Sequence, residues 1–140
     1  MDKSTEDLQS ELTRAKSFDE FCRKNDGELA FPSAVDYLNF LMKSKNINKA
    51  ALVAATNLDR TYAYHILSGR KNPGRDKLII FAIAAKASIA ETQNLLKYAK
   101  ERPLYVRDRR DGLIYYGIEH GKSLAEINFL LDENELDILE

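Results

Sequence analysis

The sequence predicts an all-α protein, and three observations carry this prediction. Polar residues that cap helices stand just ahead of apolar side chains that recur at spacings of three and four, as on one face of a helix. Asparagine or glycine follows several of these stretches, where a helix ends. A pattern typical of two successive helices also occurs twice in the chain, 35 residues apart.

The first half of the chain predicts short helices. Ser4 stands where a capping residue belongs, ahead of the apolar positions Leu8 and Leu12. The polar stretch over 24–28 then breaks the helical pattern, and a tight corner is expected at Asn57. The first predicted helical region begins at Ser4 and includes Phe18, Phe21 and Cys22. The second is capped by Ser33, has Val35, Leu38, Leu41 and Met42 on its apolar face, and ends near Asn46. Two further helices are predicted over 48–56 and over 59–67, the latter closed by Ser68 and Gly69.

The apolar run over 78–85 fits either a buried strand or a helix, because a short apolar run has no informative period. The residues around it favour a helix. Asp76 precedes the run as the expected N-cap, and Ser88 with Glu91 has the pattern of a capping box for the next helix, over 89–99.

The helical pair over 75–96 is duplicated. A shift of 35 residues superimposes it on 110–131 with ten identities in 22 positions, so chance is a poor explanation. The identical pairs are Arg75 and Arg110, Asp76 and Asp111, Leu78 and Leu113, Ile79 and Ile114, Ile83 and Ile118, Ser88 and Ser123, Ala90 and Ala125, Glu91 and Glu126, Leu95 and Leu130, and Leu96 and Leu131. Pro103 is expected to break the helix between the copies. Each copy needs an apolar neighbour, so we expect the second hairpin to pack beside the first on the same core.

Composition argues against several classes of protein. No apolar run is long enough to span a bilayer and the amino terminus is acidic, so we expect a cytoplasmic protein without a membrane partner. A single cysteine, Cys22, excludes an internal disulfide, and two histidines do not supply the ligands of a zinc site. The chain has no glycine-rich phosphate loop, no nucleophile with a histidine base and no catalytic pair of carboxylates. We therefore expect no enzyme activity, no cofactor and no metal.

The net charge of -1 hides a strongly uneven distribution. Residues 1–42 have a net charge of -4 and residues 78–140 one of -3, whereas 43–77 carry eight basic and two acidic side chains. A smaller basic cluster over 97–110 could contact phosphates or cover the hinge between the hairpins. The acidic end of the chain after Glu119 is better suited to a protein partner. The segment over 43–77 is either a solvated polar face or a site for a polyanion.

The helix predicted over 59–67 separates apolar from polar side chains. Its apolar side comprises Leu58, Tyr62, Ala63, Ile66 and Leu67. Its outward side comprises Arg60, Thr61, Tyr64, His65 and Ser68. A helix fits the major groove of DNA, where arginine can pair bidentately with guanine and threonine can contact a base edge or a thymine methyl. The basic residues Arg70, Lys71 and Arg75 follow, in a place suited to phosphate contacts.

The segment over 49–73, KAALVAATNLDRTYAYHILSGRKNP, resembles the helix-turn-helix of the Xre/Cro-type phage-repressor family. Its ending HILSGRKNP carries the most specific part of the resemblance, which extends from about Val35 to Leu96. The resemblance implies a five-helix repressor-like helix-turn-helix domain, extended here by an amino-terminal helical arm and by the duplicated carboxyl-terminal hairpin on the same core. Two positions depart from the family: Val53 and Asn57 stand where it favours alanine and glycine, although asparagine tolerates the left-handed conformation of the turn. Ala63, where the family usually has a larger aliphatic residue, leaves room that offsets Val53.

Carried over to this chain, the resemblance assigns base reading mainly to Arg60 and Thr61, with Lys49 reaching a phosphate or a base edge. His65 matches a position that points into the groove, and Tyr64 on the same face can stack on a sugar or base. The predicted base-contacting residues are Lys49, Arg60, Thr61, Tyr64 and His65. The predicted phosphate-contacting residues are Ser68, Arg70, Lys71, Asn72 and Arg75.

The sequence therefore predicts three regions: an acidic helical region over 1–30, a DNA-binding domain over 31–102 with its motif at 49–69, and a hairpin over 103–140 for interaction or dimerisation. The expected function is sequence-specific regulation of transcription by a homodimer that binds double-stranded DNA through the helix over 59–67. The alternative is a helical adaptor, whose duplicated hairpin binds a protein partner and whose helix-turn-helix does not bind DNA.

Overall fold

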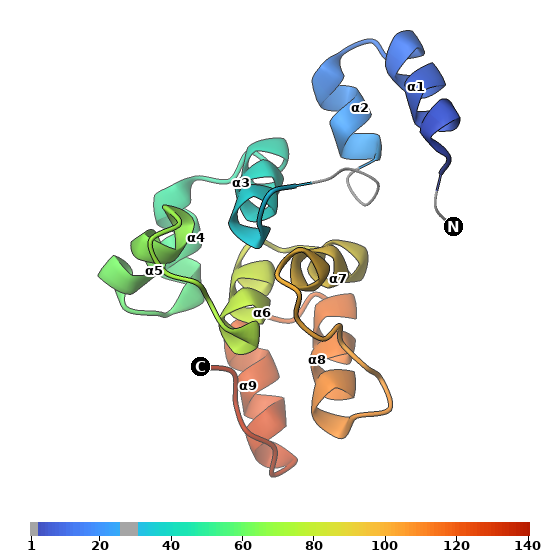
Figure 1. The fold of residues 1–140 in the computed structure, drawn as a ribbon. Coiled ribbons are helices and arrows are strands. Elements are labelled where there is room, and N and C mark those ends of the chain that lie inside the picture. Colours follow the sequence, from blue (N-terminus) through green and yellow to red (C-terminus); the bar gives the residue numbers. More distant parts are fainter. Residues whose placement is uncertain (1–2, 26–30) are drawn as a thin grey trace. The chain divides into compact units, whose positions relative to one another are not determined.

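The computed structural model describes residues 3–25 and 31–140, and within these residues it contains nine helices and no strand (Figure 1). The all-α prediction is therefore confirmed. The helices are α1 (Thr5–Arg14), α2 (Phe18–Lys24), α3 (Ala34–Ser44), α4 (Lys49–Thr56), α5 (Arg60–Leu67), α6 (Arg75–Ala84), α7 (Ile89–Tyr98), α8 (Arg109–Glu119) and α9 (Leu124–Glu133). Among the described residues, none of these helices has the length and apolar character that crossing a membrane requires.

The chain divides into two compact units, Met1–Phe31 and Pro32–Glu140. In the first unit the sequence pattern indicated one helical region, whereas the structure has two helices. Ala15 ends α1 with an extended conformation, and the Ser17 side chain accepts a hydrogen bond from the backbone N–H of Glu20 to start α2. The buried Asn25 ends α2, as expected from the polar stretch that follows, of which 26–28 lie outside the described residues.

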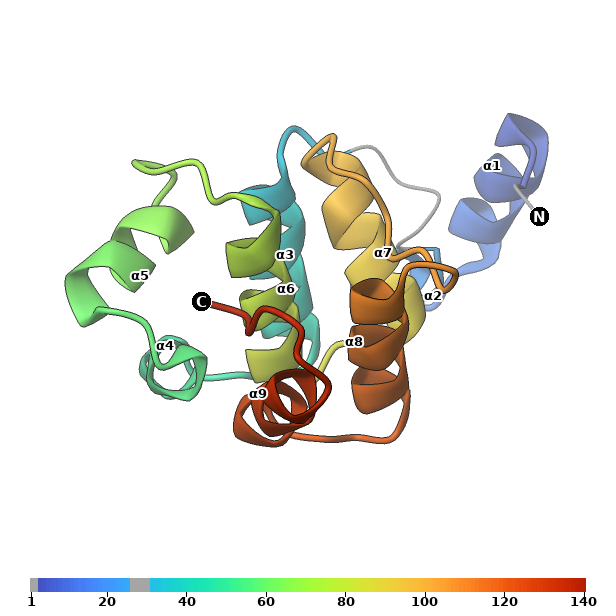
Figure 2. The same ribbon diagram turned by 90° about the horizontal axis from the view of Figure 1, so that it is seen from below.

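The core of the second unit surrounds α6, which packs against α4, α7 and α9 (Figure 2). Six consecutive residues of this helix, 78–83, are buried, because neighbours cover it on several sides. This explains why its sequence shows a continuous apolar run instead of a helical period. The largest fully buried side chains belong to Tyr37, Phe81, Leu38, Leu41, Leu52, Ile66, Leu78, Ile79, Ile80, Leu95, Leu96 and Ile114.

Most predicted caps are confirmed. Ser4 and Ser33 each accept a hydrogen bond from the backbone N–H of the third residue of their helix, and complete capping boxes occur at Ser88 and Ser123. The prediction for Asp76 is wrong. The N-cap of α6 is Gly74, without a side-chain hydrogen bond, and Asp76 lies inside the first turn. Its carboxylate is instead held by Arg110.

The two hairpins of the duplication, α6–α7 and α8–α9, are joined by reciprocal ion pairs. The Arg75 guanidinium donates to both carboxylate oxygens of Asp111, at 3.0 and 2.8 Å, and Arg110 donates to both oxygens of Asp76, at 3.1 and 2.8 Å. Arg75 corresponds to Arg110 in the repeat, and Asp76 corresponds to Asp111. Each hairpin therefore contributes the arginine of one ion pair and the aspartate of the other. Exchange of equivalent contacts is the property of a two-fold interface. The hairpins are therefore related by a pseudo-two-fold axis.

The structural repeat extends beyond the region of sequence identity. The side chain of Gln93 donates to the carbonyl of Leu104 and accepts from its N–H, and Asn128 does the same for Leu139, again 35 residues on. Arg75 and Arg110 each also donate to two carbonyls of the segment that follows their own hairpin. Each repeat thus includes its carboxyl-terminal segment, and the break expected at Pro103 lies in the first of these.

A candidate nucleic-acid interface

The corner between α4 and α5 is built by short polar side chains. The Asn48 side chain caps α4 by accepting from the Ala51 N–H at 3.1 Å. Asn57, with φ of 56°, has the left-handed conformation expected at this position. The buried Thr56 hydroxyl donates to the Val53 carbonyl at 2.6 Å and accepts from the Leu58 N–H at 3.3 Å. These bonds satisfy polar groups at the corner, where the helical hydrogen-bond pattern is interrupted.

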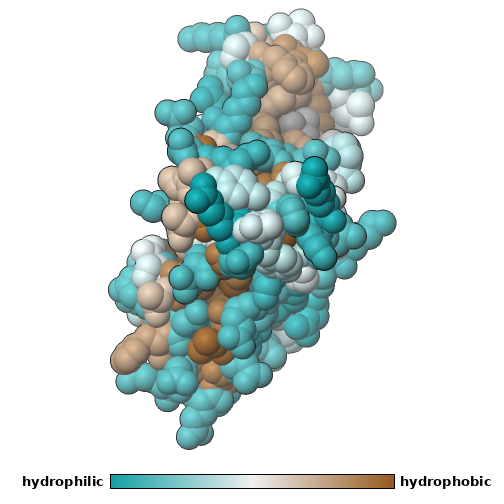
Figure 3. Space-filling view, turned by 90° about the vertical axis from the view of Figure 1, so that its left-hand side faces the viewer, coloured by the Kyte–Doolittle hydropathy of each residue, from teal (hydrophilic) through white to brown (hydrophobic). Residues whose placement is uncertain are grey.

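The helix α5 presents its polar residues outward. Asp59 caps it by accepting from the Tyr62 N–H at 3.0 Å, so the helix begins at Arg60. Ala63, Ile66 and Leu67 are buried, whereas Leu58 and Tyr62 are half-buried. The apolar side predicted from the sequence therefore faces the core, although two of its five residues lie at the edge and are only half-buried. Figure 3 shows mostly hydrophilic side chains on the side of the protein that carries α5.

Arg60 and Thr61 occupy the first turn of α5 and are both exposed. The Arg60 guanidinium carbon lies 5.9 Å from the centre of the Tyr64 ring, one helical turn further along. This contact was not predicted, although the spacing of four between an arginine and an aromatic residue is a signal for it. It orients the Arg60 side chain along the outer face of the helix. Tyr64 and His65 are half-buried, so they offer only part of their side chains to a ligand.

Lys49 is the first residue of α4 and is exposed. The amino-terminal end of a helix carries a partial positive charge and free backbone N–H groups, which favour an anion such as phosphate. Lys49 adds a full positive charge at this end. The position therefore suits a phosphate more than a neutral base edge.

The loop after α5 keeps its basic side chains in solvent. Gly69 has φ of 83°, which suits glycine, and the His65 carbonyl accepts hydrogen bonds from the backbone N–H groups of Arg70 and Lys71. Within the described residues the side chains of Arg70, Lys71 and Asn72 are exposed and make no ion pair. The Ser68 hydroxyl donates to the His65 carbonyl at 3.1 Å and is itself exposed.

Two cations of the basic segment are paired with carboxylates of the protein itself. Arg75, predicted as a phosphate contact, makes four hydrogen bonds, two to Asp111 and two to the carbonyls of Arg102 and Pro103. Its side chain is 12% exposed, so the guanidinium is not available to a phosphate. Lys45 pairs with Glu91 on α7 at 2.9 Å. The duplication was the sequence signal for a structural role of Arg75. Its counterpart Arg110 lies far from the predicted helix-turn-helix, so the repeat of this arginine is not explained by DNA binding.

Val53 on α4 and Ala63 on α5 are both buried. Val53 is 5% exposed and Ala63 is fully buried, on helices that pack together. A larger side chain on one helix thus accompanies a small one on the other.

Among the described residues, no group of three or more histidine, cysteine, aspartate or glutamate side chains could hold a metal ion.

Comparison of the chain with protein-family models, with curated proteins and with solved structures finds no match.

Proposed function

We propose that the protein is a sequence-specific regulator of transcription that binds double-stranded DNA with α5 in the major groove. The main support is the exposed pair Arg60 and Thr61 in the first turn of α5, within the most basic segment of the chain. A helix that presents hydrogen-bonding side chains at its amino-terminal end, within a positive surface, has the two properties of a DNA reader. We further propose that α3–α7 form a repressor-like domain of the Xre/Cro type.

In this proposal the outward residues of α5 differ in how closely they approach the bases. Arg60 pairs with a guanine and Thr61 contacts a neighbouring base edge, because both are exposed at the end of α5 that enters the groove. Tyr64 supports the Arg60 guanidinium, a role that its half-buried ring and their contact allow. His65, one residue further along, reaches the groove only with the exposed part of its ring.

The sugar-phosphate backbone is contacted on both sides of the groove. Lys49 binds a phosphate at the start of α4, and Ser68, Arg70, Lys71 and Asn72 bind phosphates after α5. These contacts set the register of α5 and supply affinity that does not depend on sequence. We propose that two copies bind a two-fold operator, as regulators with one reading helix per chain do.

Selection from a random duplex library tests the proposal, followed by fluorescence anisotropy of the enriched site and a scrambled duplex over a series of salt concentrations. We expect an enriched palindrome, tighter binding to it than to the scramble, and an affinity that falls steeply with salt because counterions are released. Absence of enrichment together with absence of binding at low salt contradicts the proposal.

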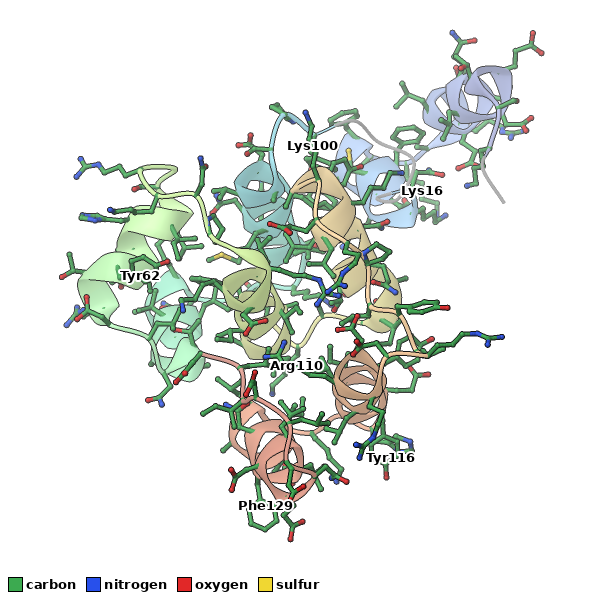
Figure 4. The ribbon with its side chains drawn as sticks, turned by 60° about the horizontal axis from the view of Figure 1, so that its bottom comes forward. Lys16, Tyr62, Lys100, Arg110, Tyr116 and Phe129 are labelled. Atoms are coloured by element: carbon green, nitrogen blue, oxygen red, sulfur yellow. The ribbon has the colours of Figure 1, made fainter. Side chains whose placement is uncertain are left out.

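A second candidate function is that of a helical adaptor that binds a protein partner through α8–α9. The observation that favours it is the exposure of Tyr116 on α8 and Phe129 on α9, at 50% and 63%, both pointing away from the core (Figure 4). Exposed apolar and aromatic side chains mark interaction surfaces when they form a patch. An adaptor without DNA binding shows no dependence of duplex affinity on salt, so the anisotropy series separates the two functions.

A further inference from the structure

The connection between α7 and α8 exposes both cations and apolar side chains. Tyr105 is 56% exposed and Val106 is 61% exposed. We define the second basic surface as the exposed side chains of Lys97, Lys100, Arg102, Tyr105, Arg107 and Arg109. Within the described residues none of its five cations makes an ion pair. Glu101 and Asp108 belong to the same segment and offset this charge only in part, so the surface stays positive.

The backbone beneath the second basic surface is firmly held. The Gln93 side chain makes two hydrogen bonds to the backbone of Leu104, which is buried. The N–H of Tyr105 donates to Asp111 at 3.0 Å, and the carbonyl of Arg102 accepts from Arg75 at 2.8 Å. A fixed backbone with free side chains is preorganised for binding, because little backbone entropy is lost when a ligand arrives.

The fold gives no stabilising reason for several of these side chains. Arg107 and Arg109 lie at the amino-terminal end of α8, where the helix dipole disfavours a positive charge. The exposed rings and methyl groups of Tyr105 and Val106 gain nothing from solvent. Lys97 and Lys100 are at the carboxyl-terminal end of α7, where the helix dipole favours them, and the charge of Arg102 helps to lower the pKa of Asp111, so these three have a structural explanation.

The internal repeat indicates the kind of ligand. Residues 105–108 precede α8 at the positions that 70–73 occupy before α6, and 70–73 include Arg70 and Lys71 of the proposed DNA interface. Both loops are basic, although their cations stand at different positions of the repeat, with Arg107 in the place of Asn72. The pseudo-two-fold axis directs these two equivalent loops to different sides of the protein. In Figures 1 and 2, α5 and the connection between α7 and α8 lie at opposite ends of the second unit.

We propose that the second basic surface binds the sugar-phosphate backbone of a second double-stranded DNA segment, so that one protein molecule bridges two duplexes. The inference rests on the proposed function, in which α5 binds the first duplex. Arg102, Arg107 and Arg109 contact phosphates, and Tyr105 packs on a sugar at the edge of the groove. The second contact does not read sequence, because it lacks a helix that enters the groove.

A bridging assay tests this inference with the full chain. An immobilised duplex that carries the selected operator captures the protein, and recovery of a second, fluorescent duplex of random sequence is measured at rising salt. The test variant combines Arg107→Glu with Arg109→Glu. The matched control combines Lys16→Glu with Lys86→Glu, which makes the same change in charge at two exposed lysines outside both surfaces.

We expect the test variant to recover about tenfold less of the second duplex while its affinity for the operator stays within about twofold of wild type, since only phosphate contacts at one surface are lost. The control variant should recover as much as wild type. Unchanged bridging by the test variant overturns the inference, because a dimer with one α5 at each end also bridges duplexes and does not need Arg107 or Arg109.

The outcome separates this inference from the proposed function. If α5 does not read DNA, an immobilised operator captures the protein no better than an immobilised scrambled duplex, and the proposed function fails. If capture is normal but the second duplex is not recovered by wild type, only the bridging inference fails. Recovery of single-stranded DNA in preference to duplex likewise overturns the inference, because the ligand is then of another kind.

Discussion

The guanidinium of Arg75 and the carboxylate of Asp111 form a two-pronged ion pair, with contacts of 3.0 and 2.8 Å, and their counterparts Arg110 and Asp76 form the same pair in the opposite sense. An open array of repeats would instead join each arginine to the next copy along the chain. The reciprocal pattern closes the interface upon itself, so a third repeat has no equivalent place to pack. The duplication therefore produces an internal dimer, and Figure 4 shows Arg110 where α6, α8 and α9 meet.

Removal of the more deeply buried pair should be the more damaging. The side chains of Arg75 and Asp111 are 12% and 3% exposed, whereas those of Arg110 and Asp76 are 22% and 34% exposed. We expect Arg75→Ala to lower the free energy of unfolding by about 3 kcal/mol, because a buried carboxylate is left uncompensated. Arg110→Ala should lower it by about 1 kcal/mol. Urea unfolding of both variants gives the comparison, and equal losses would contradict the difference in burial.

The same pair predicts how stability depends on pH. Burial alone would raise the pKa of Asp111, but hydrogen bonds from Arg75 and from the Tyr105 N–H outweigh it and hold the pKa below its ordinary value. The ionised carboxylate therefore stabilises the folded state fully above the ordinary pKa of aspartate, near 3.8, and this stabilisation is lost as the pH falls through the lowered pKa. In Asp111→Asn this pH dependence is absent. The difference in unfolding free energy between wild type and Asp111→Asn should shrink as the pH falls from 6 to 2, and a difference that is constant over this range would refute the assignment.

The sequence predicted the local structure well because local structure depends on neighbouring residues. The capping serines, the left-handed Asn57 and the capping boxes each act within a few residues, so their types suffice to place them. The duplicated pattern likewise predicted a second hairpin. The error at Asp76 has a different origin. Its partner Arg110 lies 34 residues away, and competition between a local cap and a distant ion pair is settled only in three dimensions.

The candidate interface was predictable in part for the same reason. The outward residues of α5 follow from the helical period, and their exposure agrees with it at Arg60 and Thr61. Arg75 could not be separated from Arg70 and Lys71 by sequence spacing, because all three belong to one basic stretch. Only the fold shows that Arg75 turns inward to Asp111.

Gly117 sets the distance between α8 and α9. A Cβ atom at this position would lie 2.5 Å from Cγ1 of Ile127, too close for a real contact. Alanine normally stabilises the interior of a helix by about 1 kcal/mol relative to glycine, but overpacking costs about 1 to 3 kcal/mol and should dominate. We therefore expect Gly117→Ala to lower the melting temperature. The double variant with Ile127→Ala should lose less than the sum of the single losses, and simple additivity would speak against this contact.

Asn57 has a backbone conformation that glycine adopts more easily than alanine. Its φ of 56° lies in the left-handed region, which disfavours a side chain with a Cβ by about 1 kcal/mol or more unless it is asparagine or aspartate. Asn57→Ala should therefore lower the free energy of unfolding by about 1 kcal/mol, whereas Asn57→Gly should be close to neutral. The two substitutions are each other's control, and thermal unfolding that ranks alanine at or above glycine would contradict the corner described here.

Arg60 and Lys71 should weaken DNA binding in different ways when they are replaced. Arg60 lies in the first turn of α5 against Tyr64, and Lys71 extends from the loop after this helix. We expect Arg60→Ala to reduce operator affinity by about 1 to 3 kcal/mol and to relax the preference for one base pair, because a bidentate contact to guanine is lost. Lys71→Ala should weaken binding to operator and scrambled duplex alike and make the dependence on salt shallower, since it removes one phosphate contact. Anisotropy titrations of both duplexes at several salt concentrations measure both effects. Equal losses on the two duplexes for Arg60→Ala would assign Arg60 to the backbone and move base reading to other residues of α5.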